Sequence, residues 1–368
     1  MNIKNLILCF SLAFAVSLAA TPLVKSLAYK IGAVDVPKDA RRVHKTPIPR
    51  LGGLAIFYGF LVAVLSFSVI DTQLRGILIG TLLIVGVGMV DDVKQLSAKI
   101  KLLVQLVAAC ITVFHGVEIT ALSVPEFLAE GGIVPLGWLA APITVIWIIG
   151  VTNAVNLIDG LDGLAVGVSS IATFSLFFIA ILAGETRVAI LAAALAGGCI
   201  GFLPYNFNPA KIFMGDTGST LLGYVLSVIC IQGLFKGYAI ISFIVPFLIL
   251  GLPVFDTCFA IGRRIWNHKP IMGADRGHLH HKLMDMGFSQ KQTVAILYVI
   301  AMLLGLAAVV VVEGGAYIAF VMMAVVLLFI LFGAKLFRHK SVSTPEADIV
   351  FVKPVKIETV ETEEKTEE

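Results

Sequence analysis

The stretch "ILIGTLLIVGVGMVDDVKQLSAKIK" (77–101) joins a long apolar run to two adjacent carboxylates, Asp91 and Asp92. Only glycines and Thr81 interrupt the run between Ile77 and Val90. Such a run is typical of a helix that crosses a bilayer, which needs about 20 mostly apolar residues. The Asp pair then stands where the helix meets water, and two like charges there require an opposite charge nearby.

The composition of the whole chain indicates a membrane protein. Of its 368 residues, 58% are hydrophobic and 14% are charged, and the mean hydropathy is +0.98. Soluble domains carry about 25% charged residues, so this composition excludes a soluble globular protein. The five cysteines lie in or beside apolar segments without a CxxC spacing. They are interpreted as small buried hydrophobes, and not as a disulfide framework or a zinc site.

Apolar segments long enough to span a bilayer recur along the chain. They predict an all-α polytopic integral membrane protein with about 11 (10–11) transmembrane helices over residues 1–335. The acidic segment 336–368 has no helical period and is predicted to be a cytoplasmic, mostly disordered tail. The predicted spans are about 4–29, 51–70, 74–90, 99–115, 137–155, 162–183, 187–204, 215–233, 237–257, 292–312 and 315–335.

Lysine and arginine fall mainly in every second connection between these spans. They cluster at 30–50, 94–101, 263–291 and 335–340, whereas residues 116–136 contain none. The positive-inside rule places the basic connections in the cytoplasm and the N-terminus outside. A signal peptide ending near Ala20 is the alternative for the first span. The heavier positive charge follows the apolar run, which favours a retained helix.

Five polar segments share the side predicted to be cytoplasmic. They supply carboxylates, amides, basic groups and glycines, whereas the opposite side offers short turns and a few glutamates. One composite site at the cytoplasmic face explains this distribution. The segments are "DVPKDARRVHKTPIPRLGG" (35–53), "DDVKQLSAKIK" (91–101), "NAVNLIDGLDG" (153–163), "PYNFNPAKIFMGDTGS" (204–219) and "FDTCFAIGRRIWNHKPIMGADRGHLHHKL" (255–283).

The third and fourth segments contain further acidic candidates. Asn156, Asp159 and Asp162 are spaced three residues apart, which places them on one face of a helix. The alternative is that Asp159 or Asp162 caps the helix that follows. Asp216 in "GDTGS" (215–219) is either a helix cap or part of an anion-binding helix N-terminus. No GxxxxGK[ST] sequence is present, which excludes a P-loop NTPase.

The carboxylates at the predicted helix ends indicate a metal site. Asp91, Asp92 and Asp216 would repel one another unless a cation joins them. Oxygen ligands without a nearby cysteine favour Mg²⁺, with Mn²⁺ as the alternative ion. A simpler alternative is that the Asp pair is interfacial and paired with Lys94.

The segment "GADRGHLHHKL" (273–283) combines three histidines with Arg276. Its basic character favours contact with phosphate oxygens, through Arg276 together with His278, His280 and His281. A structural role and a zinc site are the alternatives that remain open.

Taken in order, these segments resemble the polyprenyl-phosphate N-acetylhexosamine-1-phosphate transferases, glycosyltransferase family 4. The resemblance covers about residues 1–335. It rests on "KTPIPRLGG" (45–53), "GMVDDVKQLSAKIKLLVQ" (88–105), "NAVNLIDGLDGLAVG" (153–167), "PYNFNPAKIFMGDTGS" and "GADRGHLHHKL". It implies a membrane enzyme with ten or eleven spans and a cytosolic site that moves a sugar-1-phosphate from a UDP-sugar to a lipid phosphate and releases UMP.

The last motif separates two branches of that family. "GHLHHKL" after "GADR" is similar to the branch that uses UDP-N-acetylglucosamine (UDP-GlcNAc). The branch that transfers phospho-N-acetylmuramoyl-pentapeptide typically has a three-histidine run followed by Phe-Glu.

The resemblance also implies a role for each matching residue. Asp91 and Asp92 match the family's catalytic Asp pair, with Asp91 favoured for deprotonating or positioning the lipid phosphate, and Asp216 matches its Mg²⁺ ligand. No role follows for Asp256 in "PVFDT" (253–257). Residues implied at the nucleotide are Lys45, Asn156, Asp159, Asp162 near the uracil, Asn206, and Phe213 stacked on the uracil; those implied at the diphosphate and sugar are Arg276, His278, His280 and His281.

The implied partners are UDP-GlcNAc, undecaprenyl phosphate and the lipid bilayer, with Mg²⁺ as cofactor, in the bacterial plasma membrane. The reaction would begin a lipid-linked envelope glycan: a teichoic acid linkage unit, O-antigen or common antigen. No nucleic-acid partner is expected, and a homodimer is left open. The alternatives are a phospho-N-acetylmuramoyl-pentapeptide transferase and, in a different class, a secondary transporter of an anionic metabolite, whose site would lie near the membrane midplane between two repeats.

Overall fold

The computed structural model describes residues 2–36, 47–123, 133–233, 241–270 and 277–340. Residues 1–326 form one compact unit, and 327–368 form a second. The helices are α1 (Ile3–Ile31), α2 (Gly53–Phe67), α3 (Thr72–Lys94), α4 (Ala98–Phe114), α5 (Ala140–Ile158), α6 (Leu164–Leu182), α7 (Thr186–Asn206), α8 (Gly215–Gly233), α9 (Ile241–Ile249), α10 (Gly251–Trp266), α11 (Leu279–Asp285) and α12 (Gln290–Lys340), with a 3₁₀ turn η2 (Gly137–Leu139) before α5.

Strands are few among the described residues, and each is short. Strand β1 (Val34–Asp35) pairs antiparallel with β2 (Ile48–Pro49), and β3 (Ala121–Ser123) pairs antiparallel with β4 (Ile133–Pro135). Neither hairpin was expected from the sequence, because each has too few residues to show an alternating apolar pattern.

The predicted all-α membrane architecture is confirmed, and each of the first eight predicted spans coincides with one of the helices α1 to α8. Helix α2 is apolar but shorter than a typical span. Within the described residues, the segments long and apolar enough to cross a bilayer are Ile3–Ile31, Thr72–Lys94, Gly137–Ile158, Leu164–Leu182, Thr186–Asn206 and Gln290–Val312.

The later part of the chain differs from the predicted spans. The span expected at 237–257 is divided into α9 and α10, with Leu250 between them. Pro253 explains the break, because it has no N–H to donate to the carbonyl of Ile249 and fits only the first turn of a new helix. Helix α12 is continuous across the "EGG" (313–315) at which the sequence predicted a turn between two spans. The count of eleven spans therefore stays a prediction, and most of the predicted tail, 341–368, lies outside the described residues.

Helix α8 forms the centre of the unit 1–326. It packs against α2, α3, α5 and α6, and its side chains are buried on all sides from Thr217 to Gln232. Small residues make this close packing possible, as is common between helices in membranes. A Cβ atom at Gly53 of α2 would overlap the backbone of Gly218 in α8. The N-terminus of α8 therefore lies directly against its neighbours.

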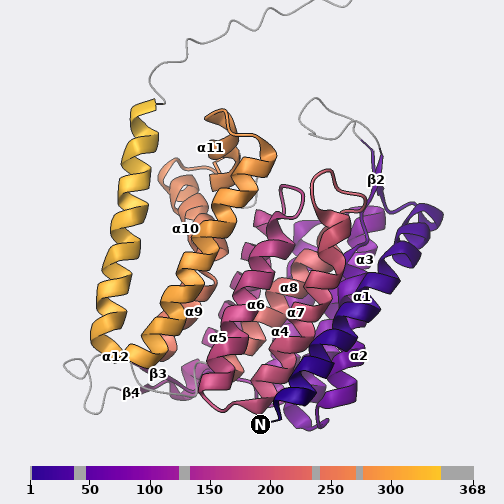
Figure 1. The fold of residues 1–368 in the computed structure, drawn as a ribbon, viewed down its shortest axis with the longest axis horizontal. Coiled ribbons are helices and arrows are strands. Elements are labelled where there is room, and N and C mark those ends of the chain that lie inside the picture. Colours follow the sequence, from indigo (N-terminus) through magenta and orange to yellow (C-terminus); the bar gives the residue numbers. More distant parts are fainter. Residues whose placement is uncertain (1, 37–46, 124–132, 234–240, 271–276, 341–368) are drawn as a thin grey trace, which may run out of the picture. The chain divides into compact units, whose positions relative to one another are not determined.

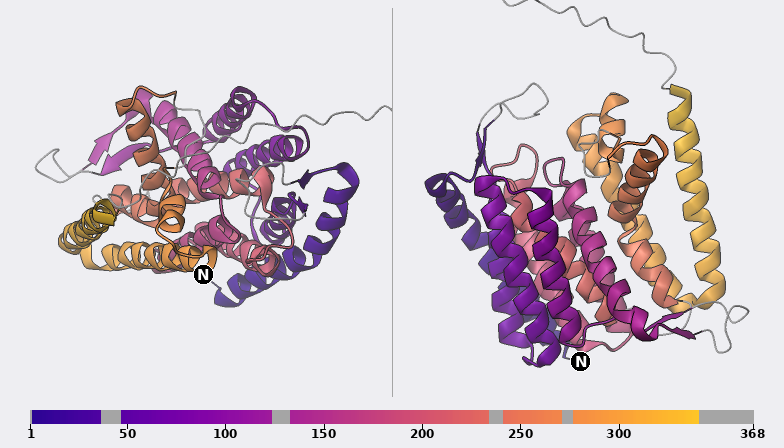
Figure 2. Two further views of the ribbon diagram at one scale, coloured as in Figure 1. Left: turned by 90° about the horizontal axis from the view of Figure 1, so that it is seen from above. Right: turned by 180° about the vertical axis from the view of Figure 1, so that it is seen from behind.

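The unit has two different ends (Figures 1 and 2). Strands β3 and β4 lie at one end with the N-terminus, and β2 and α11 lie at the opposite end. We call this second end the loop end, defined by residues 47–52, 91–97, 159–163, 207–215 and 277–289. Parts of all five polar segments found in the sequence lie there.

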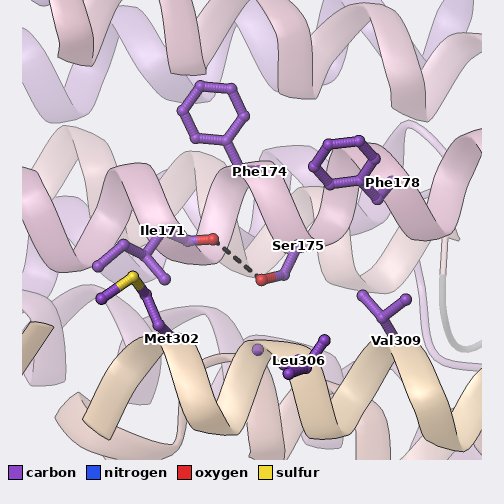
Figure 3. A pocket seen from close by; sticks show the side chains of 8 residues that line it. Ile171, Phe174, Ser175, Phe178, Met302, Leu306 and Val309 are labelled. Atoms are coloured by element: carbon purple, nitrogen blue, oxygen red, sulfur yellow. Dashed lines mark hydrogen bonds between the residues drawn. The ribbon is translucent and has the colours of Figure 1, made fainter. Parts of the chain in front are cut away.

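An apolar groove lies between α6 and α12, within the candidate spanning segments (Figure 3). Phe174 and Phe178 of α6 line one side, and Met302 and Leu306 of α12 line the other. Its polar member, Ser175, donates its hydroxyl hydrogen to the carbonyl of Ile171 at 3.0 Å. The groove contains none of the predicted site residues, whose described members lie at or near the loop end.

Candidate functional site

The carboxylate of Asp92 lies against the N-terminus of α8. Its Oδ1 accepts a hydrogen bond from the backbone N–H of Asp216 at 2.9 Å, and its Oδ2 accepts from the N–H and the hydroxyl of Thr217 at 3.1 and 2.6 Å. The side chain is 1% exposed. Gly215 allows this approach, because its φ is +73° and a Cβ there would overlap the carboxylate. A residue of α3 thus caps α8, whose first N–H groups have no partner within the helix.

Asp91 and Asp216 share one ammonium group. Lys101 of α4 places its Nζ 3.2 Å from Oδ2 of Asp91 and 2.7 Å from Oδ2 of Asp216. The other oxygen of Asp91 accepts the N–H of Leu96 at 2.6 Å. The cations beside the Asp pair are therefore Lys101 at Asp91 and Arg50, whose Nε lies 3.8 Å from Oδ1 of Asp92, and not Lys94 as in the simpler alternative. Sequence reasoning missed Lys101, although a lysine in the first turn of an apolar helix was the available signal.

The three predicted metal ligands are not placed as one group. In the part of the chain that the structure describes, no set of three or more Asp, Glu, His or Cys side chains is positioned to hold a metal ion. The reason is that both oxygens of Asp92 accept hydrogen bonds from α8, which leaves Asp91 and Asp216 facing a common cation position. Mg²⁺ usually takes one or two carboxylates together with substrate phosphates and waters. The two remaining carboxylates fit that requirement.

The prediction that Asp159 and Asp162 share a helix face is wrong. Helix α5 ends at Ile158 and α6 begins at Leu164, so both carboxylates lie in the turn between the helices. The Oδ2 of Asp162 accepts hydrogen bonds from Asn208 Nδ2 at 2.9 Å and from the N–H of Ala210 at 3.0 Å. Neither carboxylate caps α6, whose N-cap is a glycine without a side-chain hydrogen bond. Asp162 instead ties the third polar segment to the fourth.

Asp159 lies near the other acidic groups of the loop end. Its burial, with the negative charges of Asp216, Asp92 and Asp162, raises the pKa of its carboxyl to about 8. A carboxyl group that holds its proton near neutral pH is a candidate for proton transfer. Asp159, which the resemblance implies at the nucleotide, is therefore also a candidate catalytic residue.

Two predicted nucleotide-binding amides connect parts of the scaffold. Asn206 is buried; its Oδ1 accepts the N–H of Gly163 at 3.1 Å, and its Nδ2 donates to the carbonyl of Ile212 at 3.0 Å. Asn156 accepts the hydroxyl of Ser219 in α8 at 2.6 Å. These bonds hold the segments in register, and contact of either amide with a nucleotide stays a prediction.

The first polar segment joins the second through Arg50 and the fourth through Pro49. The guanidinium of Arg50 donates to both backbone carbonyls of the Asp pair, at 3.1 Å each, which places positive charge at the C-terminus of α3. Phe213 donates its N–H to the carbonyl of Pro49 at 2.8 Å and is only partly buried. No motif in the sequence predicts this role for Arg50. Lys45 and Arg276, also predicted at the site, lie outside the described residues.

The histidine motif docks on the turn that carries Asp159. The rings of His278 and His280 are parallel with centroids 5.8 Å apart, and the ring of His281 is 4.2 Å from that of His280. A Cβ atom at Gly160 would overlap the ring of His280. Burial and the neighbouring His281 lower the pKa of His280 to about 4, which keeps its ring neutral.

Comparison with known proteins identifies the family. The sequence profile of glycosyl transferase family 4 matches residues 74–234. A probable undecaprenyl-phosphate N-acetylglucosaminyl 1-phosphate transferase of Bacillus subtilis (strain 168) is 42% identical over 326 residues, which cover 88% of this chain and 90% of that protein. The chain belongs to glycosyl transferase family 4. The segment of this chain that matches the glycosyl transferase family 4 profile contains Asp91, Asp92, Lys101, Asp159 and Asp216.

Two further relatives, somewhat less similar to this chain, carry the names of two different transferases. A decaprenyl-phosphate N-acetylglucosaminephosphotransferase of Mycobacterium tuberculosis (strain H37Rv) is 34% identical over 324 residues, or 80% of each chain. A phospho-N-acetylmuramoyl-pentapeptide-transferase of Desulforudis audaxviator is 31% identical over 329 residues, which cover 79% of this chain and 93% of that one. The resemblance seen in the sequence motifs is thereby confirmed.

Proposed function

We propose that this protein transfers GlcNAc-1-phosphate from UDP-GlcNAc to undecaprenyl phosphate and releases UMP. The observation that carries the proposal is the meeting of Asp91 and Asp216, from two different helices, at one cation position at the loop end. The name of the Bacillus subtilis relative, at 42% identity, supports the donor sugar and the acceptor. The relative named for the muramoyl-pentapeptide is less similar, at 31%.

We infer that Mg²⁺, or Mn²⁺ in its place, binds between Asp91 and Asp216 at the position that Lys101 fills here. When bound, the ion would polarise the diphosphate oxygens and offset their charge. The ammonium group of Lys101 would then be released from the two carboxylates and become available to the phosphates of the substrate.

The reaction that this site supports is an in-line displacement at phosphorus. An oxygen of the lipid phosphate forms a bond to the β-phosphorus of UDP-GlcNAc, while the bond from that phosphorus to the bridging oxygen breaks and UMP leaves with the electron pair. Such transfers depend mainly on alignment and charge neutralisation. The lipid phosphate is already a nucleophile, so we favour a single displacement; trapping a phospho-sugar on Asp91 or Asp92 would establish a two-step route instead.

We further propose that the protein lies in the bacterial plasma membrane with its loop end in the cytoplasm and its N-terminus outside. The distribution of lysine and arginine supports this orientation. A transporter would have its polar site near the middle of the bundle. The described acidic residues of this site lie instead at helix ends.

Release of UMP by the purified protein tests the proposal. The protein in detergent is mixed with Mg²⁺ and undecaprenyl phosphate, and with either UDP-GlcNAc or UDP-MurNAc-pentapeptide. We expect UMP from UDP-GlcNAc only, with loss of activity after EDTA and in Asp216→Asn. UMP from the pentapeptide nucleotide only would overturn the choice of donor. UMP formed equally well in EDTA would overturn the proposal that the reaction requires Mg²⁺ or Mn²⁺.

A further inference from the structure

Asp256 and His278 form a buried pair beside the site described above. The Oδ2 of Asp256, on α10, lies 2.8 Å from Nδ1 of His278, and its Oδ1 accepts the N–H of Leu279 at 2.9 Å. The two side chains are 10% and 8% exposed, respectively. Both carboxylate oxygens are thus directed at the start of α11, from a helix more than twenty positions earlier in the chain.

The pair fixes which ring nitrogen of His278 carries the proton. An ionised carboxylate only accepts hydrogen bonds, so Nδ1 has to be the donor and must be protonated. In the neutral ring, Nε2 then has a lone pair and is the nitrogen left to meet a ligand. The backbone bond to Leu279 holds the carboxylate in place and with it the plane of the ring.

The surroundings of His278 place it next to the acidic cluster. Its ring stacks parallel to that of His280, and His280 lies against Gly160. The neighbouring Asp159 is close enough to Asp216 and Asp92 for their charges to act on it. The Asp256–His278 pair is therefore connected by direct packing to the turn that borders the proposed metal position.

We propose that Asp256 is a positioning residue that keeps His278 in the Nδ1-protonated form, so that Nε2 of His278, and not Asp91 at the metal position, accepts the proton of the acceptor phosphate. This inference rests on the proposed function for the identity of the acceptor. In the step, the O–H bond of the lipid phosphate monoanion breaks and an N–H bond forms at Nε2. The freed oxygen bonds to the β-phosphorus, UMP leaves, and the imidazolium returns its proton to water. Asp256 stabilises the positive ring, as a buried carboxylate does for a histidine base.

The variant Asp256→Asn separates this role from a structural one. An asparagine still accepts the N–H of Leu279 with its oxygen, and its amide donates to Nδ1 of His278. That arrangement moves the ring proton to Nε2 and removes the base without removing the contact. Asp285→Asn, an exposed position on the same short helix, is the matched control.

Three readouts are compared in the full-length protein: the unfolding temperature, the steady-state constants for UMP release, and ¹⁵N spectra of histidine-labelled protein with His278 assigned by its loss in His278→Gln. For Asp256→Asn we expect an unfolding temperature close to that of the unchanged protein, KM for UDP-GlcNAc within about threefold, kcat lower by about 100-fold or more, and the ring proton on Nε2. Asp256→Glu, which restores the carboxylate, should recover kcat at least about tenfold over Asp256→Asn.

The spectra decide the proposal independently of the reaction. A lone-pair nitrogen at Nδ1 in the unchanged protein, or the same ring form in Asp256→Asn, would overturn it. So would an unchanged kcat in Asp256→Asn with the proton moved, because the ring form would then be irrelevant to transfer. If Asp256→Asn fails to fold, Asp256→Glu and the unchanged protein's spectrum provide the test. Absence of UMP with any UDP-sugar would instead refute the proposed function, and leave the ring assignment measurable.

Discussion

Substitution of Asp92 by asparagine should destabilise the protein as well as inactivate it. The carboxylate accepts two N–H groups and one hydroxyl at the start of α8. An amide offers one oxygen, so one buried N–H of α8 then faces an NH₂ group. A buried donor without a partner costs about 1–3 kcal/mol, and loss of a negative charge at a helix N-terminus costs up to about 2 kcal/mol. We therefore expect the free energy of unfolding to fall by roughly 1–5 kcal/mol.

The assay compares Asp92→Asn with Asp216→Asn in mixed detergent micelles, by denaturant unfolding and by UMP release. Asp216→Asn keeps the cap on α8 and loses a partly exposed ion pair with Lys101 and one negative charge in the first turn of α8, so it should lose less stability than Asp92→Asn. Both variants should be nearly inactive. In a double-mutant cycle that combines Asp92→Asn with Thr217→Val, the coupling energy for unfolding should be about 1–2 kcal/mol, because the two side chains share a hydrogen bond.

The reasoning would be refuted if Asp92→Asn unfolded like the unchanged protein while losing activity. Asp92 would then act on the substrate or a metal directly, and the cap on α8 would be of no consequence. A stable and fully active Asp92→Asn would remove Asp92 from the site altogether.

Three further predictions concern the groups around the Asp pair. Lys101→Met should lower kcat but bind Mn²⁺ more tightly in electron paramagnetic resonance titrations, because the competing ammonium is gone; weaker Mn²⁺ binding would contradict the shared position. The raised pKa of Asp159, about 8, means that the folded protein holds a proton that the unfolded chain releases at lower pH, so in EDTA the stability should fall as the pH rises from about 4 to about 8. Asp159→Asn should remove that fall. If the stability of the variant falls with pH in the same way as that of the unchanged protein, the raised pKa of Asp159 is not the cause. Asp162→Asn should weaken the hydrogen bonds that residue 162 accepts from Asn208 and Ala210 by about 1 kcal/mol and speed amide exchange in residues 207–212. Unchanged exchange would show that these two bonds do not hold the segment in place.

The sequence predicted the helices well wherever apolar length alone decides them. Helices α1 to α8 follow from runs of apolar residues between polar turns, and the clustering of five polar segments at one end follows from their alternation along the chain. The helical face proposed for Asp159 and Asp162 failed, because the spacing of three is compatible with a turn and Gly160 and Gly163 favour the turn.

Contacts between residues that are far apart in the chain could not be predicted from the sequence. The ammonium of Lys101 between Asp91 and Asp216 depends on how α3, α4 and α8 pack, and no local pattern encodes that. The same holds for Asp256, which received no role from its motif and acquires one only when α10 meets α11. The sequence shows which acidic and basic residues are candidates for the site, but only the packing of the helices shows which of them contact one another.

The fate of the β-phosphorus tests the central claim most directly. UDP-GlcNAc labelled with ³²P at the β position is incubated with the purified protein, Mg²⁺ and undecaprenyl phosphate, and the lipid is extracted into organic solvent. The account predicts that the label moves into the lipid in a one-to-one ratio with the UMP released. Transfer of GlcNAc to the lipid with the label left in water-soluble UDP would contradict it, since attack would then occur at the sugar carbon and not at phosphorus.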